Sequence, residues 1–289
     1  MKIDTRKNSQ WDHLNGFRYA HRGLFHQPRS ASRKLNAELA AQAPLWKEDI
    51  AAWRAKGKRI VPENSMEAFR IAARHGYGSE LDVHLTADGV LAVFHDDTLL
   101  RMTGIDSQVE KMTWRELSSV RLLDTSSGIP LLDEVLQLYN QSQLPLVIEL
   151  KVKGNTSALC RSVMEAVDRY PTLDYCIESF DPRAVLWLRR NRPDVIRGQL
   201  TENFTKSRDA VRHWGHLLTF GMWCGAPDLI TRPDFISCKF SDRKNLFLQI
   251  SHRRGVKQVS WIIINGGDLQ TVEREGGLGI FEGFVPGMR

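Results

Sequence analysis

The sequence predicts an α/β fold in which eight parallel strands close into a (β/α)8 barrel. Along most of the chain, short apolar stretches with the composition of strands alternate with stretches that have the apolar period of an amphipathic helix. This alternation is typical of a parallel sheet covered by helices, and eight such strands suggest a closed barrel. The 289 residues, 42% of them hydrophobic, suffice for one large core, so we expect residues 1–289 to form a single domain.

One link between the expected strands does not fit a regular barrel. The second and third strands are joined only by a turn at Asp88-Gly89, which is too short for the helical crossover that parallel strands need. We therefore expect either a hairpin that distorts the barrel or an error in these boundaries. The eight strands are expected to begin near Gly16, Ser79, Val90, Leu146, Tyr175, Val195, Phe235 and Gln258.

Capping residues mark the start of three expected helices. Ser65 precedes an apolar helical period and is expected to be the N-cap of the helix before the second strand. Thr113 with Glu116 has the spacing of a capping box, and Asp181 followed by Pro182 is a typical helix start. Further helical segments are expected at residues 130–141, 155–169, 206–224 and 245–254.

Residues 24–61 form a basic, alanine-rich segment after the first strand. Its length is far above the two to six residues, roughly, of a usual strand-to-helix loop. We expect an insert here, serving either as a lid over the site or as a decoration of the barrel.

Charge and cysteine content narrow the class of protein. The net charge of +6 favours anionic ligands such as phosphates, but it is too weak to indicate nucleic-acid binding, and no recognition motif supports that function. The four cysteines show no CxxC spacing, so we expect buried thiols in a reducing compartment and no zinc site. The polar N-terminus and the absence of an apolar run of about 20 residues make cytoplasmic residence the expectation.

Two acidic side chains stand out in the second expected strand. Glu80 and Asp82 lie two residues apart, so both leave the same face of the strand. Two carboxylates on one face repel each other and lose solvation unless a cation compensates them. They are therefore candidate ligands of a hard metal ion, although a metal-free network with nearby basic residues is an alternative.

The ends of other strands carry further polar groups. Glu149 and Lys151 again lie two apart at a strand end, while the first strand ends on His21-Arg22 and the third on His95. Because the carboxyl ends of barrel strands meet at one mouth, we expect these groups to converge there. Three carboxylates favour Mg²⁺ or Ca²⁺, the arginine and lysine suit a phosphate, and two imidazoles can divide proton transfer. This combination indicates a phosphodiesterase.

The motifs of the chain resemble those of the glycerophosphodiester phosphodiesterase family. The similarity is strongest from Phe17 to Pro182 and continues more faintly to Trp261. The resemblance implies a TIM barrel, a divalent cation, and hydrolysis of glycerophosphodiesters to sn-glycerol 3-phosphate and an alcohol. Seven motifs occur in the family order, which are HRG at His21, PENS at Pro62, ELDVHLTADG at Glu80, FHDDTLLRMTG around His95, IPLLDEVL at Ile129, IELK around Glu149 and SFDP at Ser179.

The resemblance also assigns roles to single residues. It implies His21 and His95 as the acid and base, with attack by the glycerol 2-hydroxyl to give a cyclic phosphate or direct attack by metal-bound water. Two departures from the family pattern, the insert after Gly23 and the segment FEGFVPG, bear on which alcohol is accepted. The remaining implied residues are Glu80, Asp82 and Glu149 on the metal, Glu63 in its first or second shell, Arg22 and Lys151 on phosphate, and Trp261 lining the pocket.

Other functions remain open at this point. A lysophospholipase D or phospholipase C type activity on lipid phosphodiesters is the first alternative, and a barrel that binds a phosphodiester without cleaving it is the second. The apolar segment from Trp214 to Ile230 is expected to pack in the core, or else to form an interfacial patch for peripheral membrane contact. The small-molecule substrate's alcohol, the identity of the metal and the oligomeric state are not determined by the sequence.

Overall fold

The computed structural model describes residues 5–27, 54–203, 221 and 223–287, and its strands form a closed barrel. The strand order is β1-β9-β8-β7-β6-β5-β4-β2, and a further pairing of β1 with β2 closes the ring. Neighbouring strands around this ring are parallel. The bounds are β1 Tyr19–Ala20, β2 Gly78–Leu85, β3 Leu91–Val93, β4 Leu146–Leu150, β5 Tyr175–Ser179, β6 Arg197–Thr201, β7 Phe235–Lys239, β8 Lys257–Ile263 and β9 Leu278–Phe281.

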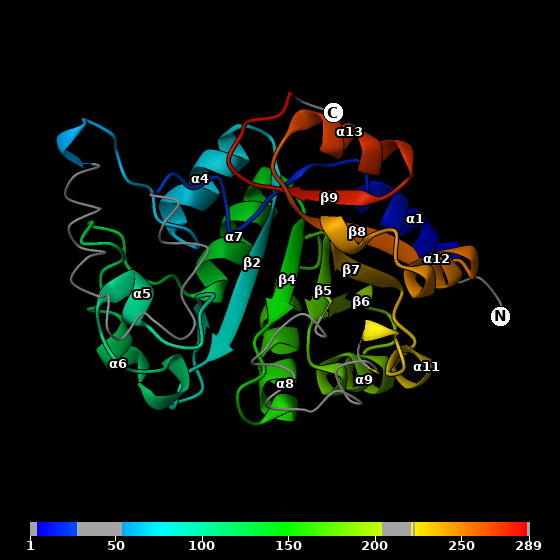
Figure 1. The fold of residues 1–289 in the computed structure, drawn as a ribbon. Coiled ribbons are helices and arrows are strands. Elements are labelled where there is room, and N and C mark those ends of the chain that lie inside the picture. Colours follow the sequence, from blue (N-terminus) through cyan, green and yellow to red (C-terminus); the bar gives the residue numbers. More distant parts are fainter. Residues whose placement is uncertain (1–4, 28–53, 204–220, 222, 288–289) are drawn as a thin grey trace.

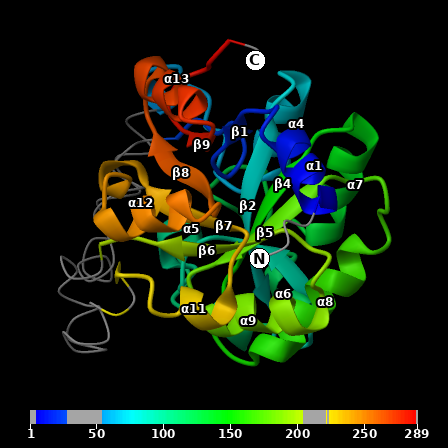
Figure 2. The ribbon, with the colours of Figure 1, turned by 90° about the vertical axis from the view of Figure 1, so that its right-hand side faces the viewer.

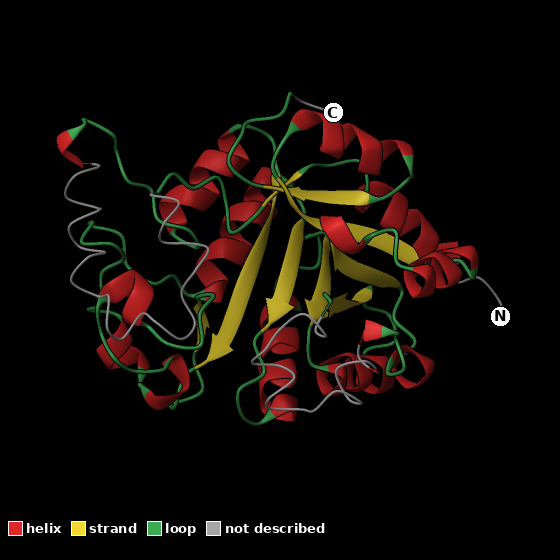
Figure 3. Cartoon of the chain, in the orientation of Figure 1, coloured by secondary structure: helices red, strands yellow, loops and turns green. Residues whose placement is uncertain are grey.

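Helices lie on the outside of the strands (Figures 1 and 2), and Figure 3 shows the strands enclosed by them. The helices are α1 Thr5–Leu14, α4 Met66–Arg74, α5 Leu100–Thr103, α6 Trp114–Leu117, α7 Leu132–Ser142, α8 Thr156–Val167, α9 Pro182–Asn191, α11 Asp228–Thr231, α12 Leu246–Arg253 and α13 Gly266–Arg274. Two 3-10 turns, Val109–Lys111 and Phe240–Asp242, complete the described elements. The predicted (β/α)8 barrel is thus confirmed.

The three predicted helix starts are confirmed by their capping contacts. The Ser65 hydroxyl accepts a hydrogen bond from the backbone N–H of Ala68, at 3.2 Å. Thr113 and Glu116 form the reciprocal bonds of a capping box at the start of α6. The Asp181 carboxylate accepts from a backbone N–H in the first turn of α9. Most of the predicted helical segment 206–224 and most of the predicted insert at 24–61 lie outside the described residues.

The third predicted strand is wrong as a barrel strand. β3 pairs antiparallel with β2, with Val83 opposite Val93, so the short Asp88-Gly89 link is the turn of a hairpin. The eighth barrel strand is instead β9, which the sequence pattern did not predict. β9 has four residues with Gly279 in the middle, and a glycine weakens the strand signal. A Cβ added at Gly279 would lie 2.6 Å from Leu269 and 2.8 Å from Ile263, so α13 and β8 pack closely against this glycine.

The hairpin leads into a second, smaller core beside the barrel, which we call the side core. Most of its residues come from the part of the sequence between β3 and α7. Buried apolar side chains hold it together, and its helices are short. This packing fixes residues 95–101 at the end of the hairpin. Its main members are Phe94, Leu99, Met102, Val109, Leu117 and Leu122.

The amino-terminal half of the barrel interior is filled by apolar side chains from several strands. Tyr19, Val147, Cys176, Phe235 and Leu278 are fully buried and belong to one cluster. Because side chains alternate between the two faces of a strand, the residues two positions further along each strand point into the carboxyl-terminal half of the same interior. On β4 this position is Glu149, and its partner in the register on β2 is Asp82.

No helix within the described part of the chain is long and apolar enough to cross a bilayer.

The barrel interior predicts a steric test at Gly198 in β6. A Cβ at this position would overlap the ring of Phe235, which is fully buried and packs on Trp11 at a centroid distance of 5.5 Å. We expect Gly198→Ala to lower the free energy of unfolding in urea by about 1–3 kcal/mol, as overpacked cores do. The control is Gly266→Ala, because the space around Gly266 is open and this change should leave stability unchanged or slightly higher. Equal stability of the Gly198→Ala variant and the parent would contradict the packing described here.

Candidate active site

Three buried carboxylates meet at the carboxyl ends of β2 and β4. Glu80 and Asp82 point from β2 and Glu149 from β4, with Asp82 and Glu149 opposite each other in the strand register. Their exposed fractions are 3%, 0% and 7%, and one oxygen from each lies within 4.8 Å of the others. The predicted convergence of these three acids therefore occurs.

Burial and mutual repulsion change the protonation of this cluster. Burial, followed by the charge of Asp82, raises the pKa of Glu80 well above its ordinary value. Burial also raises the pKa of Glu149, to about 7. Asp82 is different, because against the effect of burial the Lys151 charge holds the pKa of Asp82 well below its usual range. The cluster therefore favours a bound positive charge strongly.

Two basic residues contact the acids directly. The Lys151 Nζ lies 2.9 Å from Asp82 Oδ1 and 2.6 Å from Glu149 Oε1. The Arg22 Nε lies 3.5 Å from Asp82 Oδ2, and the Arg22 backbone N–H donates to Glu80 Oε2 at 3.0 Å. The ion pairs expected for a salt-bridge network are thus present around the same three acids.

The donor set fits a hard divalent cation. All three donors are carboxylate oxygens, they are buried, and two of them sit on one strand beside the third. Mg²⁺ and Ca²⁺ prefer such oxygen ligands, whereas zinc sites are usually built from histidine and cysteine. Glu80, Asp82 and Glu149 could therefore hold a divalent metal.

A strained turn places Arg22 over this cluster. Arg22 and Gly23 have φ values of 53° and 77°, so the chain reverses immediately after β1. A Cβ at Gly23 would lie 2.8 Å from the Ala68 backbone, which explains why glycine is needed there. The neighbouring Asn64, with φ 51°, donates from its side chain to Asp82 at 2.8 Å. The HRG and PENS motifs are therefore two loops that meet on the Asp82 carboxylate.

Each predicted catalytic histidine is held by a carboxylate. His21 Nδ1 lies 2.8 Å from Glu282 Oε2, and His95 Nδ1 lies 2.6 Å from Asp96 Oδ1. When a carboxylate accepts from Nδ1–H, the neutral ring leaves Nε2 free to accept a proton. Burial, then the charge of Arg22, lowers the pKa of His21, and the same two causes together with Lys151 lower the pKa of His95 to about 4.

Glu63 lies beside the carboxylate cluster, and its oxygens bind arginines. Its carboxylate accepts from Arg22 Nη1 at 2.7 Å, from Arg101 through both oxygens, and from the Gln27 side chain. The side chains close enough to share a metal ion with it are those of His95 and Asp96, not those of Glu80 or Asp82. Glu63 therefore holds the Arg22 side chain and is not grouped with the three clustered acids.

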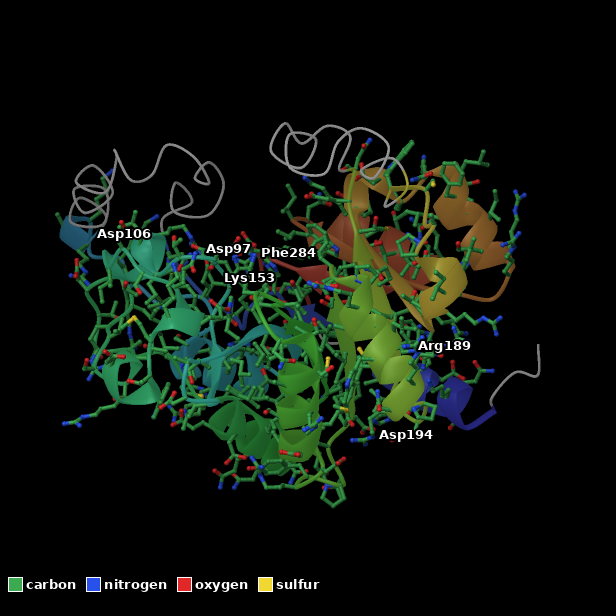
Figure 4. All side chains as sticks on the ribbon, turned by 90° about the horizontal axis from the view of Figure 1, so that it is seen from below. Asp97, Asp106, Lys153, Arg189, Asp194 and Phe284 are labelled. Atoms are coloured by element: carbon green, nitrogen blue, oxygen red, sulfur yellow. The ribbon has the colours of Figure 1, made fainter. Side chains whose placement is uncertain are left out.

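Trp261 and an ion pair lie on other parts of the mouth. The Trp261 ring on β8 is half-buried and packs edge-on against Phe180 at a centroid distance of 5.9 Å. Figure 4 looks into the carboxyl ends of the strands and shows Asp97, Lys153 and Phe284 near its centre. Lys153 Nζ lies 2.6 Å from Asp97 Oδ1, two residues beyond Lys151.

Several residues of the site were missed by the sequence reasoning. Asp96 and Arg101 lie inside the FHDDTLLRMTG motif, so their spacing from His95 was the available signal. Glu282 lies in the FEGFVPG segment, which departs from the family pattern, and the structure shows its carboxylate on His21. Glu178 on β5, opposite Glu149 in the register, is a fourth buried acid whose pKa burial raises to about 8.

Comparisons with known proteins agree with this geometry. The sequence model of the glycerophosphoryl diester phosphodiesterase family matches residues 54–281. A glycerophosphodiester phosphodiesterase from Bacillus altitudinis is 45% identical over 98 residues, which is 31% of this chain and 40% of that protein. The lysophospholipase D GDPD1 of Homo sapiens is 35% identical over 121 residues, or 37% of each chain. The matched segments thus span less than half of these two relatives.

A solved structure shares the fold over almost its whole length. It is a phosphodiesterase from Oleispira antarctica in complex with the product sn-glycerol-3-phosphate, with a TM-score of 0.67. The match covers 94% of this chain and 94% of that one, at 19% sequence identity, and so it shows a common barrel. With the family model covering most of the chain and the motif residues converging at one mouth, the protein belongs to the glycerophosphoryl diester phosphodiesterase family.

Proposed function

We propose that the protein hydrolyses glycerophosphodiesters to sn-glycerol 3-phosphate and an alcohol, with the help of a divalent cation. The observation that carries this proposal is that three buried carboxylates and two carboxylate-held imidazoles share one barrel mouth. The Bacillus altitudinis relative bears the name of this activity, and the Oleispira antarctica structure contains the product sn-glycerol-3-phosphate. Both support the proposed substrate class.

In this proposal the basic residues Arg22 and Lys151 bind the phosphodiester. Arg22 is fixed on two sides by Glu63 and Glu80, and Lys151 lies between Asp82 and Glu149. A planar guanidinium can bind two phosphate oxygens, and an ammonium adds a point charge beside them. The cation held by the three carboxylates, Mg²⁺ or Ca²⁺, would neutralise charge that develops on the phosphate oxygens. Trp261 would form an apolar wall of the pocket.

The two histidines divide the proton transfers. One imidazole accepts the proton of the attacking hydroxyl at Nε2, and the other gives a proton to the leaving alcohol oxygen, for which the negative charge of the bound phosphodiester must offset the lowered pKa of His21. The lowered pKa of His95, about 4, makes it a neutral acceptor at physiological pH. The contacts of Nδ1 with Asp96 and Glu282 stabilise each ring when Nε2 gains a proton. The attacking hydroxyl is either water or the substrate's own 2-hydroxyl, and in the second case water then opens the cyclic phosphate to give sn-glycerol 3-phosphate.

The free thiols support a reducing, cytoplasmic compartment, which is part of this proposal. Cys160, Cys176 and Cys238 are buried and free, and Cys224 is free and half-buried. Proteins of oxidising compartments commonly pair their cysteines, whereas free thiols are the rule in a reducing one.

Removal of either imidazole tests the proposed chemistry. In an assay of glycerophosphocholine with Mg²⁺ or Ca²⁺, we expect His21→Ala and His95→Ala each to lower kcat/KM by about 10²- to 10⁴-fold, the usual contribution of general acid or base catalysis. The matched control is His252→Ala, which changes an exposed histidine on α12 and should leave kcat/KM unchanged. If the parent protein forms no product above the level of the two alanine variants, the proposal is wrong.

The protonation of the acids predicts how metal affinity depends on pH. A cation binds the ionised carboxylates, so protons on Glu149, with a pKa of about 7, and on Glu80 compete with it at low pH. We expect the association constant for Mg²⁺ or Ca²⁺, measured by calorimetry without substrate, to rise by roughly tenfold per pH unit below about pH 7.

Two glutamate-to-glutamine substitutions test this prediction, one at a proposed metal ligand and one as its control. Glu149→Gln should lower the association constant of the cation and make it depend less on pH. Glu165→Gln, at an exposed position of α8, should change neither the association constant nor its pH dependence. An affinity that is the same at low and neutral pH would contradict the raised pKa values and the proposed ligands.

A lysophospholipase D activity is the second candidate function. The human relative with that name supports it, and so do the side chains of Leu229 and Ile230, which are 72% and 60% exposed on α11. These two residues were expected to pack in the core or to form a lipid patch, and their exposure agrees with the lipid patch.

Presentation of the substrate distinguishes the two functions. If the lipid activity is the main one, choline release from lysophosphatidylcholine will rise steeply above its micelle concentration and exceed release from glycerophosphocholine. The double change Leu229→Ser and Ile230→Ser should then remove the rise with micelles and leave glycerophosphocholine turnover intact. A rate that does not respond to micelles would exclude this candidate.

A further inference from the structure

We infer that Arg101 is a positioning residue that aligns a proton-transfer group, His95, and a phosphate-binding group, Arg22, through two separate carboxylates. This inference rests on the proposed function and adds a residue that does not itself contact the substrate. Arg101 belongs to α5, outside the ring of barrel strands, and is 6% exposed.

One side of the Arg101 guanidinium binds Asp96. Arg101 Nη2 donates to Asp96 Oδ1 at 2.9 Å, and Nε donates to Oδ2. The same Oδ1 atom lies 2.6 Å from His95 Nδ1. Asp96 is thereby held by a two-point contact, and its rotation would break the bond to His95.

The other side of the guanidinium binds Glu63. Arg101 Nη1 lies 3.2 Å from Glu63 Oε2, and Nη2 donates to Oε1. That same Oε1 accepts from Arg22 Nη1 at 2.7 Å, while Gln27 holds the remaining oxygen. Arg101 therefore stands one carboxylate away from Arg22 and one carboxylate away from His95.

The side core fixes Arg101 itself. Its neighbours Leu99 and Met102 are buried in that core, and α5 ends at Gly104, which has φ 76°. With the edges of its guanidinium bound to the carboxylates of Asp96 and Glu63, Arg101 is not placed to bind substrate. Arg101 thus links the packing of the side core to the carboxylates at the barrel mouth.

A purely structural role explains this network poorly. Buried ion pairs are costly to desolvate, and apolar residues of similar volume stabilise a fold at least as well. Here three charged side chains join the proton-transfer group His95 to the phosphate-binding group Arg22. Small displacements of reactive groups are enough to slow catalysis, because the reacting atoms must start in a narrow range of geometries. The arrangement is that of a second shell which orients the first.

The test separates the two arms of the network kinetically. With glycerophosphocholine as substrate, Asp96→Asn should lower kcat with little change in KM, and Glu63→Gln should raise KM with a smaller effect on kcat. Arg101→Lys keeps the charge but loses the fork, so it should do both, with a loss in kcat/KM on the order of 10- to 100-fold. In Arg101→Ala, millimolar guanidinium ion should restore part of the lost rate.

The matched control is Arg192→Lys. Arg192 also bridges two aspartates, with Nη2 at 2.9 Å from Asp168 and 3.1 Å from Asp194. Figure 4 shows Asp194 well away from Asp97 and Lys153 at the mouth. This variant should keep the parent's kcat and KM. If Arg101→Lys lowers the melting temperature but leaves both kinetic constants of the folded protein unchanged, Arg101 is only structural and the inference is overturned.

A readout without turnover separates this inference from the proposed function. Long-range ¹H–¹⁵N spectra report which ring nitrogen of His95 carries the proton. The parent should show the Nδ1–H tautomer of His95, and Arg101→Lys should shift it towards a mixture while His21 stays unchanged. A parent that hydrolyses no glycerophosphodiester but shows this tautomer shift would refute the function alone. An active parent whose His95 tautomer and kinetics ignore Arg101→Lys would refute the inference alone.

Discussion

The structure depends on one electrostatic constraint. Glu80, Asp82 and Glu149 converge in the carboxyl-terminal half of the barrel interior. Three carboxylates buried this close repel one another and lose their solvation, which alone would destabilise the fold. Lys151 and Arg22 offset this cost by direct contact. The three acids therefore need Lys151 and Arg22 beside them, and these are the same basic residues that could bind a phosphate.

The compensating charges need anchors of their own, and these anchors shape the loops around the mouth. Arg22 sits in a left-handed turn, which Gly23 completes because no larger residue fits against Ala68. Glu63 holds the Arg22 side chain, and Asn64 reaches Asp82 from the same loop. The mouth is therefore a set of loops tied to one another through charged side chains as well as by the strands.

The sequence predicted the parts of this arrangement that depend on local periodicity. Glu80 and Asp82, and Glu149 with Lys151, follow from the alternation of side chains along a strand, and their convergence follows from the rule that parallel strands end together. The hairpin partner β3 was placed in the barrel because an apolar run alone does not give strand direction. β9 was missed because four residues around a glycine give too weak a signal.

Local sequence patterns could not predict contacts between residues that are far apart in the chain. Glu282 binds His21 across 261 positions, and nothing near either residue indicates that pairing. Arg101 was visible inside its motif, but its direction depends on how the side core packs against the barrel. Glu63 was recognised as part of the site, whereas its arginine partners became visible only in three dimensions.

The contact between His21 and Glu282 joins the first strand of the barrel to the segment after its last strand. The His21 backbone N–H also donates to the Phe281 carbonyl at 2.9 Å, so the ring closes at the same place. Both contacts can form only after the ribosome has supplied the residues that follow β8. A nascent chain can assemble the acids of β2 and β4 much earlier, but it acquires a fully oriented His21 only after Phe281 and Glu282 have been made.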